Sequence, residues 1–191
     1  MMSHQRAVST KVADTSKQGK ATPESNVRRV VVDAETTGLD PGHRILEIGC
    51  VEMIGRNLTG RSFHRYLNPE REIDLGAQAV HGISGERVAG EPKFAEIANE
   101  LVDFIRGAEL IMHNAEFNAT YLNYELGLLK FPPLERIAVG IVDTLTMARA
   151  IRPGLGNSIA ALCTEYQLDD SDRQCHGALL DAKLTAQSIW R

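Results

Sequence analysis

The stretch Val30-Val31-Val32-Asp33-Ala34-Glu35-Thr36-Thr37-Gly38 places two acidic residues at the end of a short β-branched run. Such runs favour strands and a Thr-Gly pair favours a turn, so the stretch predicts a strand that ends at the acids. Side chains alternate between the faces of a strand, so Asp33 and Glu35 project from the same face. Burying two neighbouring carboxylates is costly unless cations neutralise them, which indicates a metal site. The alternative is a solvent-facing acidic strand end, which the D-x-E pattern alone would favour.

Two further strand patterns follow this stretch. Ile45 to Met53 is an apolar strand, and after a turn with Gly55, Asn57 and Gly60 the residues 62–67 alternate in polarity. This pattern predicts an antiparallel meander of three strands.

Helices and short strands then alternate along the chain. After a loop at 68–90, apolar residues recur at helical spacing over 94–105, and short apolar strands follow at 110–112 and 141–142. Further helices are predicted over 115–129, around Leu145 to Ala148, from Asn157 or Ser158 to Tyr166, and over 177–190. Three strands followed by this alternation predict an α/β protein with a mixed sheet and helices packed on it.

The bulk composition fits one globular domain. The chain has 191 residues, of which 43% are hydrophobic and 24% charged. Residues 1–26 are polar and without periodicity, which predicts a disordered tail before a domain at 27–191. No apolar run reaches the roughly 18–20 residues that cross a bilayer, and no signal peptide is evident. We therefore expect a cytoplasmic protein without a membrane partner, with Cys50, Cys163 and Cys175 as reduced thiols.

The formal net charge of −4 argues against nucleic acid bound through a basic surface. A site that holds metal ions escapes this argument, because the cations supply the positive charge that faces a phosphate. The charge therefore predicts weak, transient binding and excludes nothing more.

Two other segments carry residues that could join the acidic strand end. His113-Asn114-Ala115-Glu116-Phe117-Asn118 follows a predicted strand, and it also fits a plain helix start with Asn114 as the cap. Near the other end of the sequence, His176 precedes a helix that carries Asp181 in its first turns. His176 could serve as a base near neutral pH, although a lone histidine there also fits a surface residue. Acidic residues at 143, 169, 170 and 172 are interpreted as helix caps and loop charges.

Taken together and in this order, the motifs D-x-E-T-T-G, H-N-A-x-F and H-x4-D resemble the DnaQ-like superfamily of 3′–5′ exonucleases, in its DEDDh branch. The similarity covers residues 27–191 and is closest to the exonuclease domain of proofreading (epsilon) subunits of bacterial DNA polymerase III. Other stretches that carry it are 44–49, 58–60, 80–83, 94–96, 105–110, 157–158 and 161–163.

The resemblance implies a ribonuclease-H-like fold, three antiparallel strands then parallel strands with helices on both faces, and two divalent ions, Mg²⁺ or Mn²⁺. By analogy, Asp33 would bridge both ions, Glu35 and Asp181 would complete the ligands of the first, and His176 would take a proton from water. The product would be a nucleoside monophosphate released from a DNA 3′ end. The candidates for contacting the terminal nucleotide are Thr36, Thr37, Leu39 and His81.

One position departs from the family pattern. Asn118 stands where the family has aspartate, and an amide is neutral with one acceptor oxygen. The residue could be engineered, natural in an impaired relative, or tolerated with slower turnover. The sequence therefore predicts an exonuclease with reduced activity; the alternative is an impaired module that binds DNA 3′ ends or a partner protein.

The resemblance also implies polymerase III subunits as partners. Epsilon subunits carry a tethering tail after the exonuclease domain, whereas this sequence stops at Arg191, ten residues past Asp181. Either a tail has been removed or the protein works without that tether.

Overall fold

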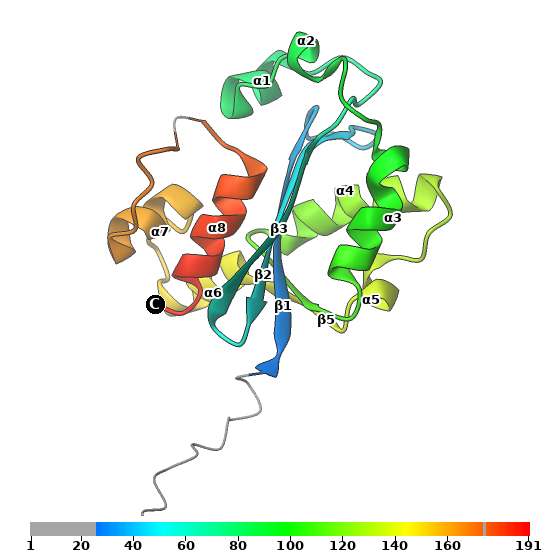
Figure 1. Cartoon of the computed structure of the whole chain (residues 1–191). Helices are drawn as coiled ribbons and strands as arrows, with labels where there is room; N and C mark the ends of the chain where they lie inside the picture. Colours follow the sequence, from blue (N-terminus) through cyan, green and yellow to red (C-terminus); the bar gives the residue numbers. More distant parts are fainter. Residues whose placement is uncertain (1–25, 174) are drawn as a thin grey trace, which may run out of the picture.

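The computed structural model describes residues 26–173 and 175–191, which form a five-stranded sheet with helices on both faces (Figure 1). The strands are β1 (Arg28–Thr36), β2 (Ile45–Ile54), β3 (Asn57–Tyr66), β4 (Glu109–Met112) and β5 (Gly140–Asp143). The helices are α1 (Leu75–His81), α2 (Gly85–Val88), α3 (Phe94–Ile105), α4 (Ala115–Leu128), α5 (Leu134–Ile137), α6 (Thr144–Ile151), α7 (Ile159–Tyr166) and α8 (Ala178–Ser188).

The sheet is mixed, and β1 lies at its centre. The strand order is β3-β2-β1-β4-β5. Strands β1, β2 and β3 pair antiparallel, whereas β4 pairs parallel with β1 and β5 parallel with β4. The predicted fold class is therefore confirmed.

Alternation along β1 divides the core into two layers. Val30, Val32 and Ala34 face a large apolar cluster that includes residues of α3 and α4. Val31 faces the other way, into a smaller cluster that includes Ala182 and Ala186 of α8. In Figure 1, α3, α4 and α5 lie on one side of the sheet and α7 and α8 on the other. Since side chains alternate, Asp33 and Glu35 share the face of Val31, which is the face covered by α8.

The loop predicted at 68–90 is wrong in part, because α1 and α2 lie there. Ser84 caps α2 through its hydroxyl, and the buried side chains of Ile83 and Val88 pack with Leu46 of β2. Helices of seven and four residues are too short to produce a clear apolar period, so the sequence pattern does not reveal them.

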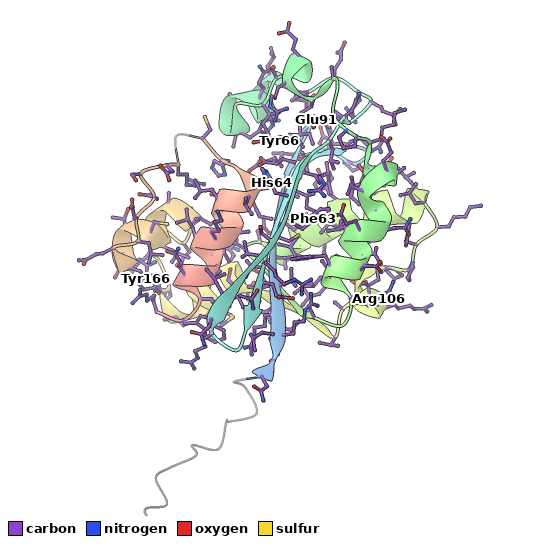
Figure 2. All side chains as sticks on the ribbon, in the orientation of Figure 1. Phe63, His64, Tyr66, Glu91, Arg106 and Tyr166 are labelled. Atoms are coloured by element: carbon purple, nitrogen blue, oxygen red, sulfur yellow. The ribbon has the colours of Figure 1, made fainter. Side chains whose placement is uncertain are left out.

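Strand β3 is longer than the predicted 62–67, because it begins at Asn57. Gly60 lies within it at φ +86°, a conformation that glycine adopts without steric cost. Farther along, Phe63 packs into the larger core and His64 lies on the other face of the strand (Figure 2).

The predicted helix ends are confirmed for two helices and corrected for a third. Asp143 caps α6, with Oδ1 accepting from the amide of Leu145 at 2.9 Å, and Ser158 caps α7. Asn114 precedes α4 at φ +67°, but its side chain makes no capping hydrogen bond. The predicted helix over 177–190 spans Ala178–Ser188.

Other expectations meet the structure only in part. The tail predicted at 1–26 falls, except for Asn26, outside the described residues. Across 26–173 and 175–191, no helix has the length and apolar character needed to cross a membrane. In the same ranges Cys50 and Cys163 are buried and Cys175 is exposed, and all three are free thiols.

Candidate active site

The acidic end of β1 lies unusually close to α8, and Gly49 of β2 allows this approach. Gly49 pairs with Asp33 across the two strands. A Cβ atom at position 49 would lie 2.3 Å from the backbone nitrogen of Leu179, closer than real Cβ atoms come. Glycine therefore lets the first turn of α8, with Asp181, pack directly over the carboxylates of β1.

Helix α8 and the residues just before it bring two of the predicted site residues to Glu35. Asp181 is 1% exposed, and its Oδ2 lies 3.4 Å from Nδ1 of His176. Glu35, His176 and Asp181 each offer one ligand atom, and these atoms all lie within 4.8 Å of one another. The backbone of His176 is held in place by its amide, which donates to the carbonyl of Val80 in α1 at 3.2 Å.

Helix α4 brings Asn118 to Asp33 from the other layer of the protein. Asn118 is 1% exposed, and its Nδ2 donates to Oδ1 of Asp33 at 3.3 Å and to the carbonyl of His113 at 3.4 Å. The buried Oδ1 of Asn118 has no hydrogen-bond partner among the described residues. An unpaired acceptor of this kind is costly to bury, which indicates that something absent from the polypeptide faces it.

Burial and mutual repulsion perturb the titration of these groups. Burial raises the pKa of Asp33 well above its usual range, and the neighbouring Glu35 and Asp181 raise it further. Burial followed by the charges of Asp181 and Glu47 raises the pKa of Glu35 to about 8. Burial and the nearby guanidinium of Arg173 lower the pKa of His176, which favours the neutral imidazole.

The residues present fit divalent cations. Three carboxylates, those of Asp33, Glu35 and Asp181, converge at this end of β1. The raised pKa values of Asp33 and Glu35 express a shortage of positive charge. Carboxylate and amide oxygens are the hard ligands that Mg²⁺ and Mn²⁺ prefer. The unpartnered oxygen of Asn118 adds a neutral ligand atom beside Asp33. The structure places Asp33, Glu35, Asn118, His176 and Asp181 at the same end of β1, and their metal-binding and catalytic roles stay a prediction.

A cleft of about 1080 Å³ opens over the carboxylates and reaches across both layers. Its lining includes Thr36, Leu39 and His81, three of the residues predicted to contact a terminal nucleotide. Leu39 is 80% exposed and presents an apolar side chain at the rim. Phe117 and Leu155 add further apolar surface, which suits a flat nucleobase.

The fourth predicted contact residue, Thr37, has a different position. It is fully buried, and its hydroxyl bonds with Nδ1 of His43 at 2.9 Å and accepts from the amide of Arg44 at 3.0 Å. It is not among the described residues that line the cleft. Its contacts are those of a turn residue that supports the end of β1.

Sequence reasoning missed two charged residues that touch the site. Arg173 bonds both oxygens of Asp181, at 2.6 and 2.9 Å. Glu47 is 2% exposed; its Oε1 accepts from Nε2 of His64 at 2.7 Å and its Oε2 from the amide of Ala178 at 3.2 Å. A signal for Glu47 existed, because it is an acid with apolar neighbours on both sides near the start of the predicted strand.

Comparison with known proteins gives matches over most of the chain. The model of the Exonuclease family matches residues 30–188. DNA polymerase III subunit epsilon of Rickettsia conorii is 48% identical over 166 residues, covering 85% of this chain and 72% of that one. The Escherichia coli subunit is 47% identical over 167 residues, covering 84% and 69%.

Solved structures give the same picture. Exonuclease X in complex with 5′ overhanging duplex DNA superposes with a TM-score of 0.65 at 26% identity, covering 85% of this chain and 88% of that one. Exonuclease I superposes with a TM-score of 0.75 at 16% identity, covering 85% and 40%, a likeness of fold alone.

Proposed function

The chain belongs to the Exonuclease family, and from that membership we propose that its acidic cleft removes nucleotides from DNA 3′ ends. It is a metal-dependent 3′–5′ exonuclease of the proofreading kind. The observation that carries the assignment of the site is the convergence of Glu35, His176 and Asp181 beside Asp33.

We assign Asp33, Glu35 and Asp181 as the residues that would hold two divalent ions, Mg²⁺ or Mn²⁺. When bound, such ions neutralise the charge that develops at the scissile phosphate and make water more acidic. Asn118 offers one neutral oxygen where a carboxylate would offer a charged one. The cluster therefore carries one negative charge fewer than the family pattern.

The remaining residues handle the proton and the nucleotide. Nδ1 of His176 is the nitrogen that can accept a proton, because the neighbouring guanidinium nitrogen can only donate to it. Water attacks the terminal phosphodiester, the bond from phosphorus to the 3′ oxygen breaks, and a nucleoside monophosphate leaves. Leu39 at the rim supports the last base, with Thr36 and His81 lining the cleft beside it.

The substrate that fits this cleft is a single-stranded or frayed DNA end. The net charge of −4 does not favour a long, tightly held duplex, so binding is expected to be transient. Because its sequence is 47–48% identical to those of epsilon subunits, the protein would work with DNA polymerase III subunits. Co-purification with the polymerase subunit tests that association.

The neutral amide of Asn118 favours a second candidate function. With one negative charge missing from the cluster, the domain would bind DNA 3′ ends or a partner protein without hydrolysing DNA. The discriminating experiment measures mononucleotides released from a 3′-labelled single strand with Mg²⁺ and, separately, Mn²⁺. Asp33→Ala and Asn118→Asp are compared with the protein itself.

The outcomes separate the two functions. If the protein digests the strand and Asp33→Ala abolishes digestion, it is a working exonuclease that tolerates its asparagine. If only Asn118→Asp digests the strand, the binding function replaces the catalytic one. If Asp33→Ala still digests the strand, the proposed active site around Asp33 is wrong.

A further inference from the structure

Arg173, in the segment between α7 and α8, points into the acidic site. Its side chain is 11% exposed. Its Nε lies 2.6 Å from Oδ1 of Asp181, and its Nη2 lies 2.9 Å from Oδ2. This is the two-pronged geometry in which a guanidinium occupies both oxygens of a carboxylate at once.

The same guanidinium also engages His176. Its Nη2 lies 3.2 Å from Nδ1 of His176. A guanidinium has no acceptor, so Nδ1 must receive the hydrogen bond, and a neutral imidazole then carries its proton on Nε2. Arg173 therefore takes the lone pair of His176 together with both oxygens of Asp181.

Arg173 supplies positive charge where the acidic cluster lacks it. Asp181 forms a compact ligand group with Glu35 and His176, and Arg173 contacts two of these three residues. A divalent ion held by Asp181 would face the guanidinium at short range, and two positive groups on one carboxylate repel each other. Arg173 therefore competes with a divalent ion for the oxygens of Asp181 and also engages His176.

We infer that Arg173 is a resident counter-ion that stabilises the metal-free site and withdraws from Asp181 when a divalent ion binds. The inference rests on the proposed role of Asp181 as a metal ligand. Withdrawal frees both carboxylate oxygens of Asp181 for the ion and ends the hydrogen bond from Arg173 to Nδ1 of His176. Arg173 thus sets how strongly the site binds metal.

The test is calorimetric titration with Mn²⁺ in the absence of DNA, together with thermal melting in EDTA and in Mn²⁺. Arg173→Ala removes the competing charge. Arg173→Gln, which keeps more of the length and a donor, serves where the alanine variant unfolds in EDTA. Arg149→Ala is the control, because Arg149 is an exposed arginine on the same cleft.

Both Arg173 variants should bind Mn²⁺ about tenfold more tightly, since a single and a double charge about 6 Å apart repel to that extent even in a water-like dielectric. In EDTA both variants should also melt at a lower temperature than the parent. Addition of Mn²⁺ should raise their melting temperature by more than it raises that of the parent. The control should change little in either measurement.

Equal or weaker Mn²⁺ binding by the two variants would overturn the inference and make Arg173 a supporting residue. If the parent protein takes up no Mn²⁺ at all, the proposed metal site itself fails. If the parent binds and the Arg173 variants match it, only the role of Arg173 fails.

Discussion

Replacement of Asn118 by aspartate adds a carboxylate to a site that already holds three. Asn118 is 1% exposed and donates to Asp33 at 3.3 Å. Asn118→Asp replaces the donating NH₂ group by a carboxylate oxygen of nearly the same shape. Two carboxylate oxygens, one from each residue, then face each other. The change therefore alters charge and hydrogen bonding while leaving the packing of α4 almost untouched.

In the metal-free protein, protonation limits how much the free energy of unfolding can fall in Asn118→Asp. Two unit charges about 3.3 Å apart repel by about 5 kcal/mol at an effective dielectric constant of about 20. A buried aspartate can escape that repulsion by taking up a proton. Doing so at pH 7, about three units above its ordinary pKa, costs about 4 kcal/mol. We expect a loss of about 2–4 kcal/mol, or roughly 5–15 °C in melting temperature for a chain of this size.

Metal should reverse the sign of the effect. With Mg²⁺ or Mn²⁺ present, the added charge becomes a ligand, so Asn118→Asp should gain more stability from the ion than the parent gains. Release of mononucleotides should rise substantially. Melting curves in EDTA measure the stability without metal, and curves in Mn²⁺ measure the stability gained from the ion. The labelled-strand assay measures the release of mononucleotides.

Asn114→Asp is the matched control, because Asn114 is exposed, lies on the same cleft and precedes the same helix. It adds the same charge outside the cluster and should move the melting temperature by only a few degrees. The reasoning is refuted if Asn118→Asp melts like this control in EDTA and neither binds Mn²⁺ more tightly nor cuts faster.

Three other predictions follow from the geometry of the site. Gly49→Ala should cost about 1–3 kcal/mol and abolish cleavage, because its Cβ would meet the backbone of Leu179; Gly127→Ala, with open space around it, should be neutral or stabilising. In EDTA the raised pKa of Glu35, about 8, contributes stability that is present below about pH 4.5 and is lost as the pH rises through about 8. Chemical denaturation should show that the free energy of unfolding falls by roughly 3–5 kcal/mol between these pH values in EDTA. The fall should be absent when Mn²⁺ is present. Glu47→Gln should reduce that fall, because the charge of Glu47 contributes to the raised pKa; an unchanged fall would contradict the role of Glu47.

The local pattern predicted the part of the site that depends on strand geometry. A period of two puts Asp33 and Glu35 on one face whatever the tertiary structure, and both lie on the face covered by α8. Asn118 and Asp181 required the family motif, because nothing local indicates that α4 and α8 reach the same end of β1.

The residues that sequence reasoning missed are those whose partners are set by tertiary packing. Glu47 sits in a strand with both faces covered, so an acid that alternation would place toward solvent is buried under α8. Arg173 lies outside the helices and strands, and its direction depends on how α7 and α8 pack together. Helices α1 and α2 were missed for a related reason, since they are held by contacts of Ile83 and Val88 rather than by an apolar period.

The carboxylates at the end of β1 come from segments far apart in the sequence, with Asp33 and Glu35 in β1 and Asp181 in α8. Asp33 precedes Asp181 by more than a hundred residues, and Asp181 reaches the carboxylates of β1 only after α8 docks. A nascent or half-folded chain would possess the first carboxylates but no complete cluster, since N-terminal parts emerge and fold first. The complete cluster would then form in one step, when α8 has packed on the sheet.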